Sequence, residues 1–179
     1  MLKSVFILGG ASSGKSVLAL RLAGKQPGRK IFIATAQAGD REMAGRIARH
    51  QAERGPSWVT VEEPVALTAA LQRHDGPDSV LLVDCLTVWL SNLMTNQGLG
   101  PALVSEHCQA LIAALAGLRG RVYLVAGEVG LGLVPEYPLG RLFREQAGRL
   151  NQMVAQACEQ VILVTAGLPL VLKGNALED

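Results

Sequence analysis

The chain has little that would tie it to an oxidising compartment or to a membrane. Its 179 residues include only three cysteines, Cys85, Cys108 and Cys158, which are far apart and odd in number. This pattern favours reduced thiols in a cytoplasmic protein over a disulfide framework, a metal site or a catalytic thiol. No apolar run approaches the ~20 residues of a membrane span, and we expect no signal peptide.

The chain also lacks a marked excess of either positive or negative charge. The sequence has 17 Lys and Arg against 15 Asp and Glu, a net charge of +2, which is too close to neutral to predict a nucleic-acid groove or a membrane-surface patch. Apolar residues make up 49% and charged residues 18%, so a disordered chain is excluded. The length fits one domain, residues 1–179, with a sizeable core.

The most informative stretch follows a short apolar run at residues 5–8. It matches G-x-x-x-x-G-K-[ST] and consists of Gly9, Gly10, Ala11, Ser12, Ser13, Gly14, Lys15 and Ser16. Glycines let the backbone N–H groups of such a loop wrap a phosphate chain, and the next helix offers its positive end. Lys15 would meet the β- and γ-phosphates, and the Ser16 hydroxyl would bind Mg²⁺. The loop therefore predicts a site for ATP or GTP with Mg²⁺, against the alternative of a ligand-free glycine-rich turn.

Apolar runs alternate with helical patterns along the chain. Strands are predicted at residues 3–8, 30–34, 58–62, 80–84, 121–126 and 161–165, with a last edge strand at 170–173. Helices are predicted at residues 15–23, 41–54, 64–73, 101–118 and 139–158, and a buried helical turn or short helix at 85–93. This alternation indicates an α/β fold with a mainly parallel central sheet flanked by helices.

Polar residues end three of the predicted strands. Asp84 follows four apolar residues. In P-loop proteins this pattern ends a strand beside the P-loop strand and places an acid near Mg²⁺. The alternative is an ordinary strand followed by a turn aspartate. Thr35, between Ala34 and Ala36, ends the second strand, where ligands of parallel sheets collect. Glu62 is equally consistent with a contact to the ribose or base and with a surface carboxylate.

The predicted helix at 41–54 carries a histidine on its apolar face. Met43, Ile47, His50 and Arg54 follow i, i+4, i+7, i+11 and share one side. His50 is either a core histidine with a backbone hydrogen bond or a nucleophile. The second role is chemically possible because an unperturbed imidazole has a pKa of about 6.5 and is largely neutral at pH 7. Its neighbours Gln51, Ala52, Glu53 and Arg54 are candidates for the lining of a nucleotide site.

Further motifs extend this pattern over nearly the whole chain. They are Ile33-Ala34-Thr35-Ala36, Asp40-x-Glu42-Met43-x-x-Arg46-Ile47-x-x-His50, Trp58-x-Thr60-x-Glu62-x-Pro64, Val83-Asp84-Cys85-Leu86-Thr87-x-Trp89-Leu90-x-Asn92-Leu93, Glu128-Val129-Gly130-x-Gly132-x-Val134-Pro135-Glu136, Phe143-Arg144-x-x-x-Gly148-Arg149-x-Asn151-Gln152 and Gly167-Leu168-Pro169. Together with the P-loop, the series resembles the bifunctional adenosylcobinamide kinase / adenosylcobinamide-phosphate guanylyltransferase family. The chain departs from the common family pattern at Ser12, where many members carry arginine, and at Gly127, where many carry asparagine.

The resemblance implies a P-loop, RecA-like fold, a homotrimer and two reactions. The first phosphorylates the aminopropanol hydroxyl of adenosylcobinamide with ATP or GTP. The second transfers GMP from GTP to adenosylcobinamide phosphate, giving adenosylcobinamide-GDP and pyrophosphate, through a guanylylated histidine. His50 stands at the family position for that histidine, eight residues after Glu42.

Two other functions fit the residues. A P-loop small-molecule kinase would form no covalent nucleotide intermediate, and a nucleotide-binding switch or assembly ATPase subunit would modify no corrinoid. Glu128, Arg141, Arg144 and Arg149 follow the core strand at 121–126. They are candidates for contacts either with substrate or with a neighbouring subunit.

Overall fold

A seven-stranded sheet forms the centre of the protein in the computed structural model, which describes residues 3–37 and 55–177. The strand order is β3-β2-β4-β5-β1-β6-β7. All neighbouring strands are parallel except β6 and β7. The strands are β1 (Ser4–Gly9), β2 (Arg29–Ala34), β3 (Trp58–Glu62), β4 (Ser79–Asp84), β5 (Arg121–Gly127), β6 (Gln160–Thr165) and β7 (Leu168–Lys173).

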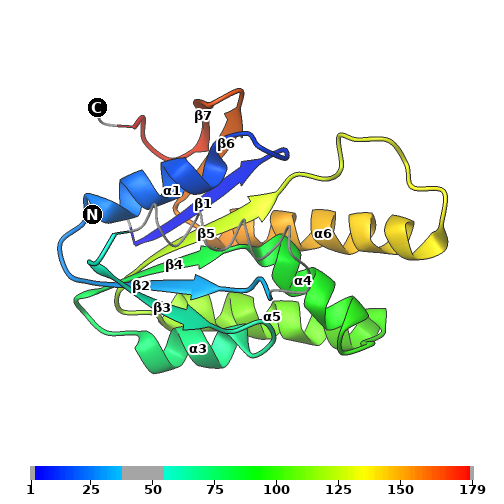
Figure 1. Ribbon diagram of the computed structural model, residues 1–179, viewed down its shortest axis with the longest axis horizontal. Coiled ribbons are helices and arrows are strands. Elements are labelled where there is room, and N and C mark those ends of the chain that lie inside the picture. The colour runs from blue at the N-terminus through cyan, green and yellow to red at the C-terminus, as the bar shows by residue number, and fades with distance from the viewer. Residues whose placement is uncertain (1–2, 38–54, 178–179) are drawn as a thin grey trace.

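Helices cover both faces of the sheet (Figure 1). They are α1 (Lys15–Gly24), α3 (Leu67–His74), α4 (Leu86–Thr95), α5 (Pro101–Gly117) and α6 (Pro138–Ala157). Among the described helices, α1 lies on one face of the sheet, and α3, α4, α5 and α6 lie on the opposite face. None of the helices within the described ranges is long and apolar enough to cross a bilayer.

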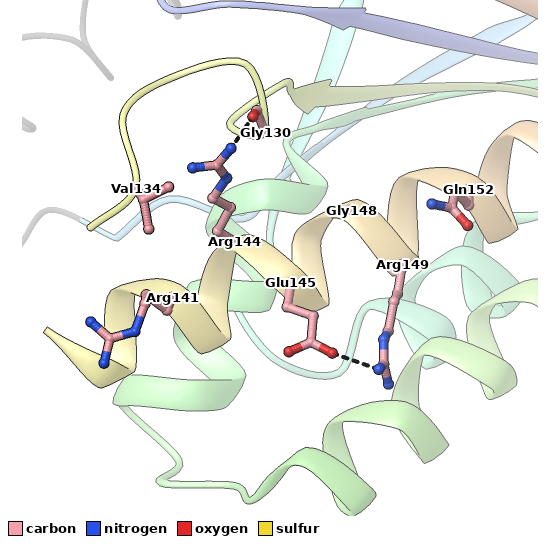
Figure 2. Close-up of a pocket in the computed structure, with 8 residues that line it drawn as sticks. All are labelled: Gly130, Val134, Arg141, Arg144, Glu145, Gly148, Arg149 and Gln152. Carbon is pink, nitrogen blue, oxygen red and sulfur yellow. Dashed lines mark hydrogen bonds and ion pairs between the residues drawn. The ribbon is translucent and has the colours of Figure 1, made fainter. Parts of the chain in front are cut away.

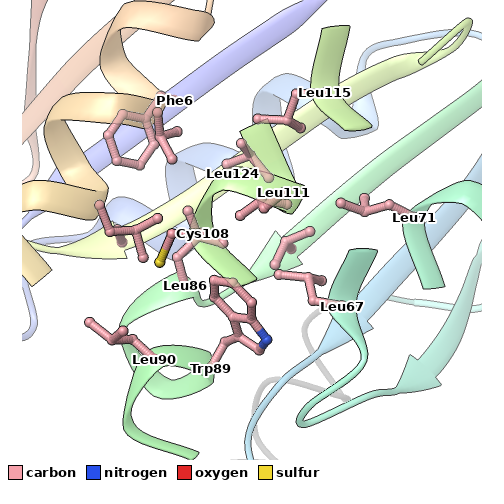
Figure 3. Close-up of a cluster of buried hydrophobic side chains, with 14 of the residues drawn as sticks. Phe6, Leu67, Leu71, Leu86, Trp89, Leu90, Cys108, Leu111, Leu115 and Leu124 are labelled. Carbon is pink, nitrogen blue, oxygen red and sulfur yellow. The ribbon is translucent and has the colours of Figure 1, made fainter. Parts of the chain in front are cut away.

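The two faces have separate apolar cores because successive side chains of a strand point to opposite sides. In β1, Val5 and Ile7 pack with α1, whereas Phe6 and Leu8 pack with the four-helix side. Figure 3 shows this larger core, in which Trp89 is buried; its Nε1–H donates to the Val65 carbonyl oxygen at 2.8 Å. Burial on both faces explains why the strands are continuous apolar runs in the sequence.

The α/β prediction is confirmed, and most elements begin and end within about two residues of the predicted bounds. The helix expected from Pro64 is an exception, because α3 begins at Leu67. The Glu63 carboxylate accepts hydrogen bonds from the N–H groups of Val65 (3.1 Å) and Ala66 (2.8 Å), which holds these residues in a bend before the helix. The helix predicted at 41–54 lies wholly outside the described residues.

The three cysteines are free thiols, as expected. Cys108 and Cys158 are buried, and Cys85 is half-buried at the end of β4. Burial raises the pKa of the Cys85 thiol to about 11 and that of the Cys158 thiol to about 12. These thiols stay protonated near neutral pH, so they are poor nucleophiles.

Gly9 is tightly enclosed where β1 meets the following loop. A Cβ there would lie 2.3 Å from Ser13 Oγ and 2.6 Å from the Val164 carbonyl oxygen. Gly9→Ala is therefore expected to lower the free energy of unfolding by about 1–3 kcal/mol in urea titrations. Gly10→Ala is the matched control, because its Cβ would have no atom within 4 Å; equal unfolding midpoints for the two variants would contradict the clash.

Candidate functional site

The predicted phosphate loop joins the end of β1 to the start of α1. Two residues in it have left-handed backbone conformations, Ser12 with φ 54° and Gly14 with φ 94°. Glycine adopts this conformation without a steric penalty. Lys15 and Ser16 form the first residues of α1, so both lie at the positive end of the helix dipole. The sequence motif thus has the strand, turn and helix that a phosphate-binding loop requires.

Two polar side chains in the loop are of chemical interest. Lys15 Nζ donates to the Gly10 carbonyl oxygen at 3.0 Å, which uses one of its three N–H donors and keeps the ammonium over the loop. Ser13 Oγ is buried and has no hydrogen-bond partner among the described residues. A buried hydroxyl normally has a partner, so this loop fits a ligand that supplies acceptors, as a phosphate chain does.

Neighbouring strand ends hold the loop from both sides. The Glu128 N–H donates to the Gly9 carbonyl oxygen at 3.0 Å, and the Gly167 N–H donates to the Ser13 carbonyl oxygen at 2.9 Å. Glu128 follows β5 and Gly167 precedes β7, and β5 and β6 are the strands on either side of β1. The loop therefore lies at the carboxyl edge of the parallel sheet, where such folds bind ligands.

A buried threonine ties the ends of β2 and β4 together. Thr35 is fully buried; its Oγ1 donates to the Cys85 carbonyl oxygen at 2.8 Å and accepts the Cys85 N–H at 2.9 Å. Asn92 Nδ2 in turn donates to the carbonyl oxygens of Thr35 (2.8 Å) and Pro64 (3.0 Å). We expected Thr35 to meet the nucleotide, and in the structure its hydroxyl fixes the backbone beside Asp84.

The sequence analysis placed Asn92 in a motif but gave it no role, although a signal for one was present. It lies in the apolar stretch that forms α4, and a polar side chain there must find partners when it is buried. The hydrogen bonds of Asn92 and Thr35 together hold the segment between Asp84 and α4.

Thr35→Val and Thr35→Ser separate the hydroxyl from the shape of the side chain. Valine leaves the Cys85 N–H and carbonyl groups without this partner, and an unmade buried hydrogen bond costs about 1–3 kcal/mol. Serine keeps the hydroxyl and loses one methyl group, worth about 0.8 kcal/mol. We expect urea unfolding to rank wild type above Ser and Ser above Val; a valine variant as stable as wild type would contradict the described role.

The acidic candidates lie farther from the phosphate loop than expected. Asp84 is half-buried at the end of β4, but β5 lies between β4 and β1, so the expectation of adjacent strands is wrong. Two strand spacings separate β4 from β1 by roughly 10 Å. Glu62 is exposed at the end of the edge strand β3, four strand positions from β1, and the structure does not bring it to the loop.

The remaining candidates divide into two groups. Ala34 and Ala36 are half-buried and flank Thr35 at the end of β2. The other group lies outside the described residues and comprises His50, Gln51, Ala52, Glu53 and Arg54. Within the part of the chain that is described, no group of three His, Cys, Asp or Glu side chains could hold a metal ion.

Comparison with known families agrees with the motifs. Residues 5–172 match the family described as cobinamide kinase / cobinamide phosphate guanyltransferase. The chain belongs to this family. Among characterised members, it is 48% identical over 171 residues to the bifunctional adenosylcobalamin biosynthesis protein CobP of Pseudomonas aeruginosa, covering 96% of this chain and 98% of that protein. It is 37% identical over 180 residues to CobU of Escherichia coli K12, covering 94% and 99%.

Solved structures of low sequence identity share the fold of this cobinamide kinase / guanyltransferase family member. The P4 protein of bacteriophage phi6 in complex with ADP aligns with a TM-score of 0.53 at 12% identity, over 94% of this chain and 54% of P4. The type III secretion ATPase EscN of enteropathogenic E. coli aligns with a TM-score of 0.55 at 13% identity, over 92% and 43%. The expected P-loop fold is therefore confirmed.

Proposed function

We propose that the protein phosphorylates adenosylcobinamide with ATP or GTP and then transfers GMP from GTP to the product. The second reaction gives adenosylcobinamide-GDP and pyrophosphate. The observation that carries this proposal is the complete phosphate loop at residues 9–16, built between β1 and α1 in a chain whose family match spans residues 5–172.

In the kinase reaction the protein mainly positions the reactants and neutralises charge. The hydroxyl oxygen of the acceptor attacks the γ-phosphorus, and the nucleoside diphosphate leaves. The backbone N–H groups of the loop and the Lys15 ammonium stabilise the charge on the phosphate oxygens. Ser16 and Asp84 offer a hydroxyl and a carboxylate, the oxygen ligands that Mg²⁺ prefers, and bound Mg²⁺ would neutralise phosphate charge.

In the guanylyl transfer His50 acts as the nucleophile. Its ring nitrogen forms a bond to the α-phosphorus of GTP, the bond between that phosphorus and the bridging oxygen breaks, and pyrophosphate leaves. The loop and Lys15 stabilise the charge on pyrophosphate. A phosphate oxygen of adenosylcobinamide phosphate then displaces the histidine nitrogen and takes GMP. We assign Gln51, Ala52, Glu53 and Arg54, with Ala34, Ala36 and Glu62, to the surroundings of the nucleotide.

The test is incubation with GTP labelled with ³²P at the α-phosphate, followed by denaturation. We expect protein-bound label that is acid-labile and base-stable, that maps to His50 and that transfers to adenosylcobinamide phosphate. Phosphorylation of adenosylcobinamide without any label on the protein would instead indicate a plain P-loop kinase. Nucleotide binding without activity on either corrinoid would indicate a switch or an assembly ATPase.

We further propose that the chain acts as a single domain in a cytoplasmic homotrimer. Leu168, Leu170 and Leu172 are all exposed on the edge strand β7, and alternate residues of a strand share one face. An apolar strip of this kind favours burial against another subunit. Light scattering on the purified protein tests the proposal by giving the mass directly, and a monomeric mass would refute it.

A further inference from the structure

A groove runs along α6 from Arg141 to Gln152, beneath the loop that follows β5 (Figure 2). It has a volume of about 690 Å³ and is lined by Gly130, Val134, Arg141, Arg144, Glu145, Gly148, Arg149 and Gln152. Four of these residues are specified positions of the Phe143–Gln152 motif, to which the nucleotide chemistry gives no role: Arg144, Gly148, Arg149 and Gln152. We call it the α6 groove.

The α6 groove is linked to the phosphate loop through Glu128. The Glu128 N–H bonds to the Gly9 carbonyl oxygen at 3.0 Å, and the Glu128 carboxylate accepts the Gly130 N–H at 2.5 Å. Gly130 lines the groove and accepts a hydrogen bond from Arg144 Nη2. The groove therefore opens beside the edge of the sheet at which phosphoryl groups would be transferred.

The lining of the groove is rich in positive charge and in hydrogen-bond donors. It contains three arginines and one carboxylate. Arg141 and Arg144 also bond to carbonyl oxygens of the overlying loop, and Arg144 Nη1 is buried without a partner among the described residues. Arg149 pairs with Glu145 at 2.5 Å, and both side chains are more than half exposed. Guanidinium groups donate only, so the groove suits a ligand that carries acceptor oxygens.

Gly148 is the least expected residue of the groove. It lies inside the 20-residue helix α6, where glycine destabilises a helix relative to alanine. Its φ is not among the positive values of the described glycines, and an added Cβ would meet nothing within 4 Å. Neither the backbone conformation nor the packing requires a glycine here, which indicates that the bare helix surface serves a close approach from outside.

We infer that the α6 groove binds the acceptor substrate, with Gly148 as its floor and Arg149 and Gln152 as donors. This inference rests on the proposed function. The acceptor is a large molecule fringed with carboxamide oxygens, and it carries a phosphate monoester after the first reaction. Both kinds of oxygen accept hydrogen bonds from arginine, and the phosphate gains further from the positive charge.

Gly148→Ala separates a ligand-binding role from a structural one. We expect KM for adenosylcobinamide and Kd for adenosylcobinamide phosphate to rise roughly tenfold, since a misplaced methyl group in a binding site has effects of this size. KM for the nucleoside triphosphate should not change, and the thermal midpoint should equal or exceed that of wild type. Gly117→Ala is the matched control, because Gly117 also lies in a helix with open space at its Cβ and outside the groove.

Arg149→Gln and Arg149→Lys test the charge. The glutamine variant should bind adenosylcobinamide phosphate more weakly than wild type does, and the loss should be larger than for adenosylcobinamide. The lysine variant should recover part of the lost affinity for the phosphate. If KM for adenosylcobinamide and Kd for adenosylcobinamide phosphate are unchanged in Gly148→Ala and Arg149→Gln while the wild type is active, the α6 groove does not bind the acceptor. The proposed function would still stand. If light scattering shows that these variants no longer form the oligomer while their KM and Kd values for the acceptors are unchanged, the groove is a contact between subunits and not an acceptor site. A wild-type protein that acts on neither corrinoid would overturn the proposed function itself.

Discussion

Lys15→Ala is expected to reduce both the kinase and the guanylyltransferase activity by about 10²- to 10³-fold, the usual effect of removing one preorganised donor from a developing anion. In the proposed kinase reaction Lys15 would meet charge on the transferred phosphoryl group, and in the proposed guanylyl transfer it would meet charge on the departing pyrophosphate. Because the same Lys15 ammonium over the same loop would serve both reactions, we expect both activities to fall by a similar factor. Initial rates of both reactions at saturating acceptor give the comparison.

Lys25→Ala is the matched control for this prediction. Lys25 is exposed at the other end of α1, so its removal lowers the net charge by the same amount without altering the loop. We expect both activities of this variant to stay near wild type. Full retention of either activity in Lys15→Ala would mean that the two reactions use separate nucleotide sites.

His50→Asn should divide the two activities instead of lowering both. Asparagine offers no nucleophilic ring nitrogen, so guanylyl transfer should fall by on the order of 10⁴-fold or more. In the proposed mechanism the phosphorylation of adenosylcobinamide would not use the histidine, so it should remain measurable. The assay follows both products from the same preparation, with the two substrates supplied separately.

The other two histidines provide controls for His50→Asn. His74 ends α3, and His107 is exposed on α5; neither lies at the carboxyl edge of the sheet. His74→Asn and His107→Asn should keep both activities and the covalent label. Guanylyl transfer at the wild-type rate in His50→Asn would remove the histidine from the mechanism.

The sequence predicted the strands well for a physical reason. A parallel strand that is buried on both faces needs apolar side chains throughout, and residues 80–83 and 122–126 show this directly. The start of α3 was harder, because Pro64 is compatible with a first helical turn while the Glu63 carboxylate stabilises a bend. Local preference alone did not decide between these two conformations.

The phosphate loop was predictable because its whole chemistry lies in eight consecutive residues. The position of Asp84 was not, since the insertion of β5 between β4 and β1 depends on strand order and not on any local pattern. The bonds from Thr35 to Cys85 and from Asn92 to Thr35 join residues 50 and 57 positions apart. The α6 groove likewise needs a loop and a helix to meet in space.

The neighbours of β1 also bear on how the protein forms during synthesis. This first strand pairs with β5 and β6, both of which are made late, and its loop is held by Gly167 near the end of the chain. Closing such long loops is a slow step in folding. As the ribosome releases the chain, the phosphate-binding motif emerges before β5 and β6 and can take its final shape only when both strands and Gly167 have followed. A nascent fragment would therefore carry the motif without binding nucleotide, and the completed β6–β7 hairpin would switch the site on.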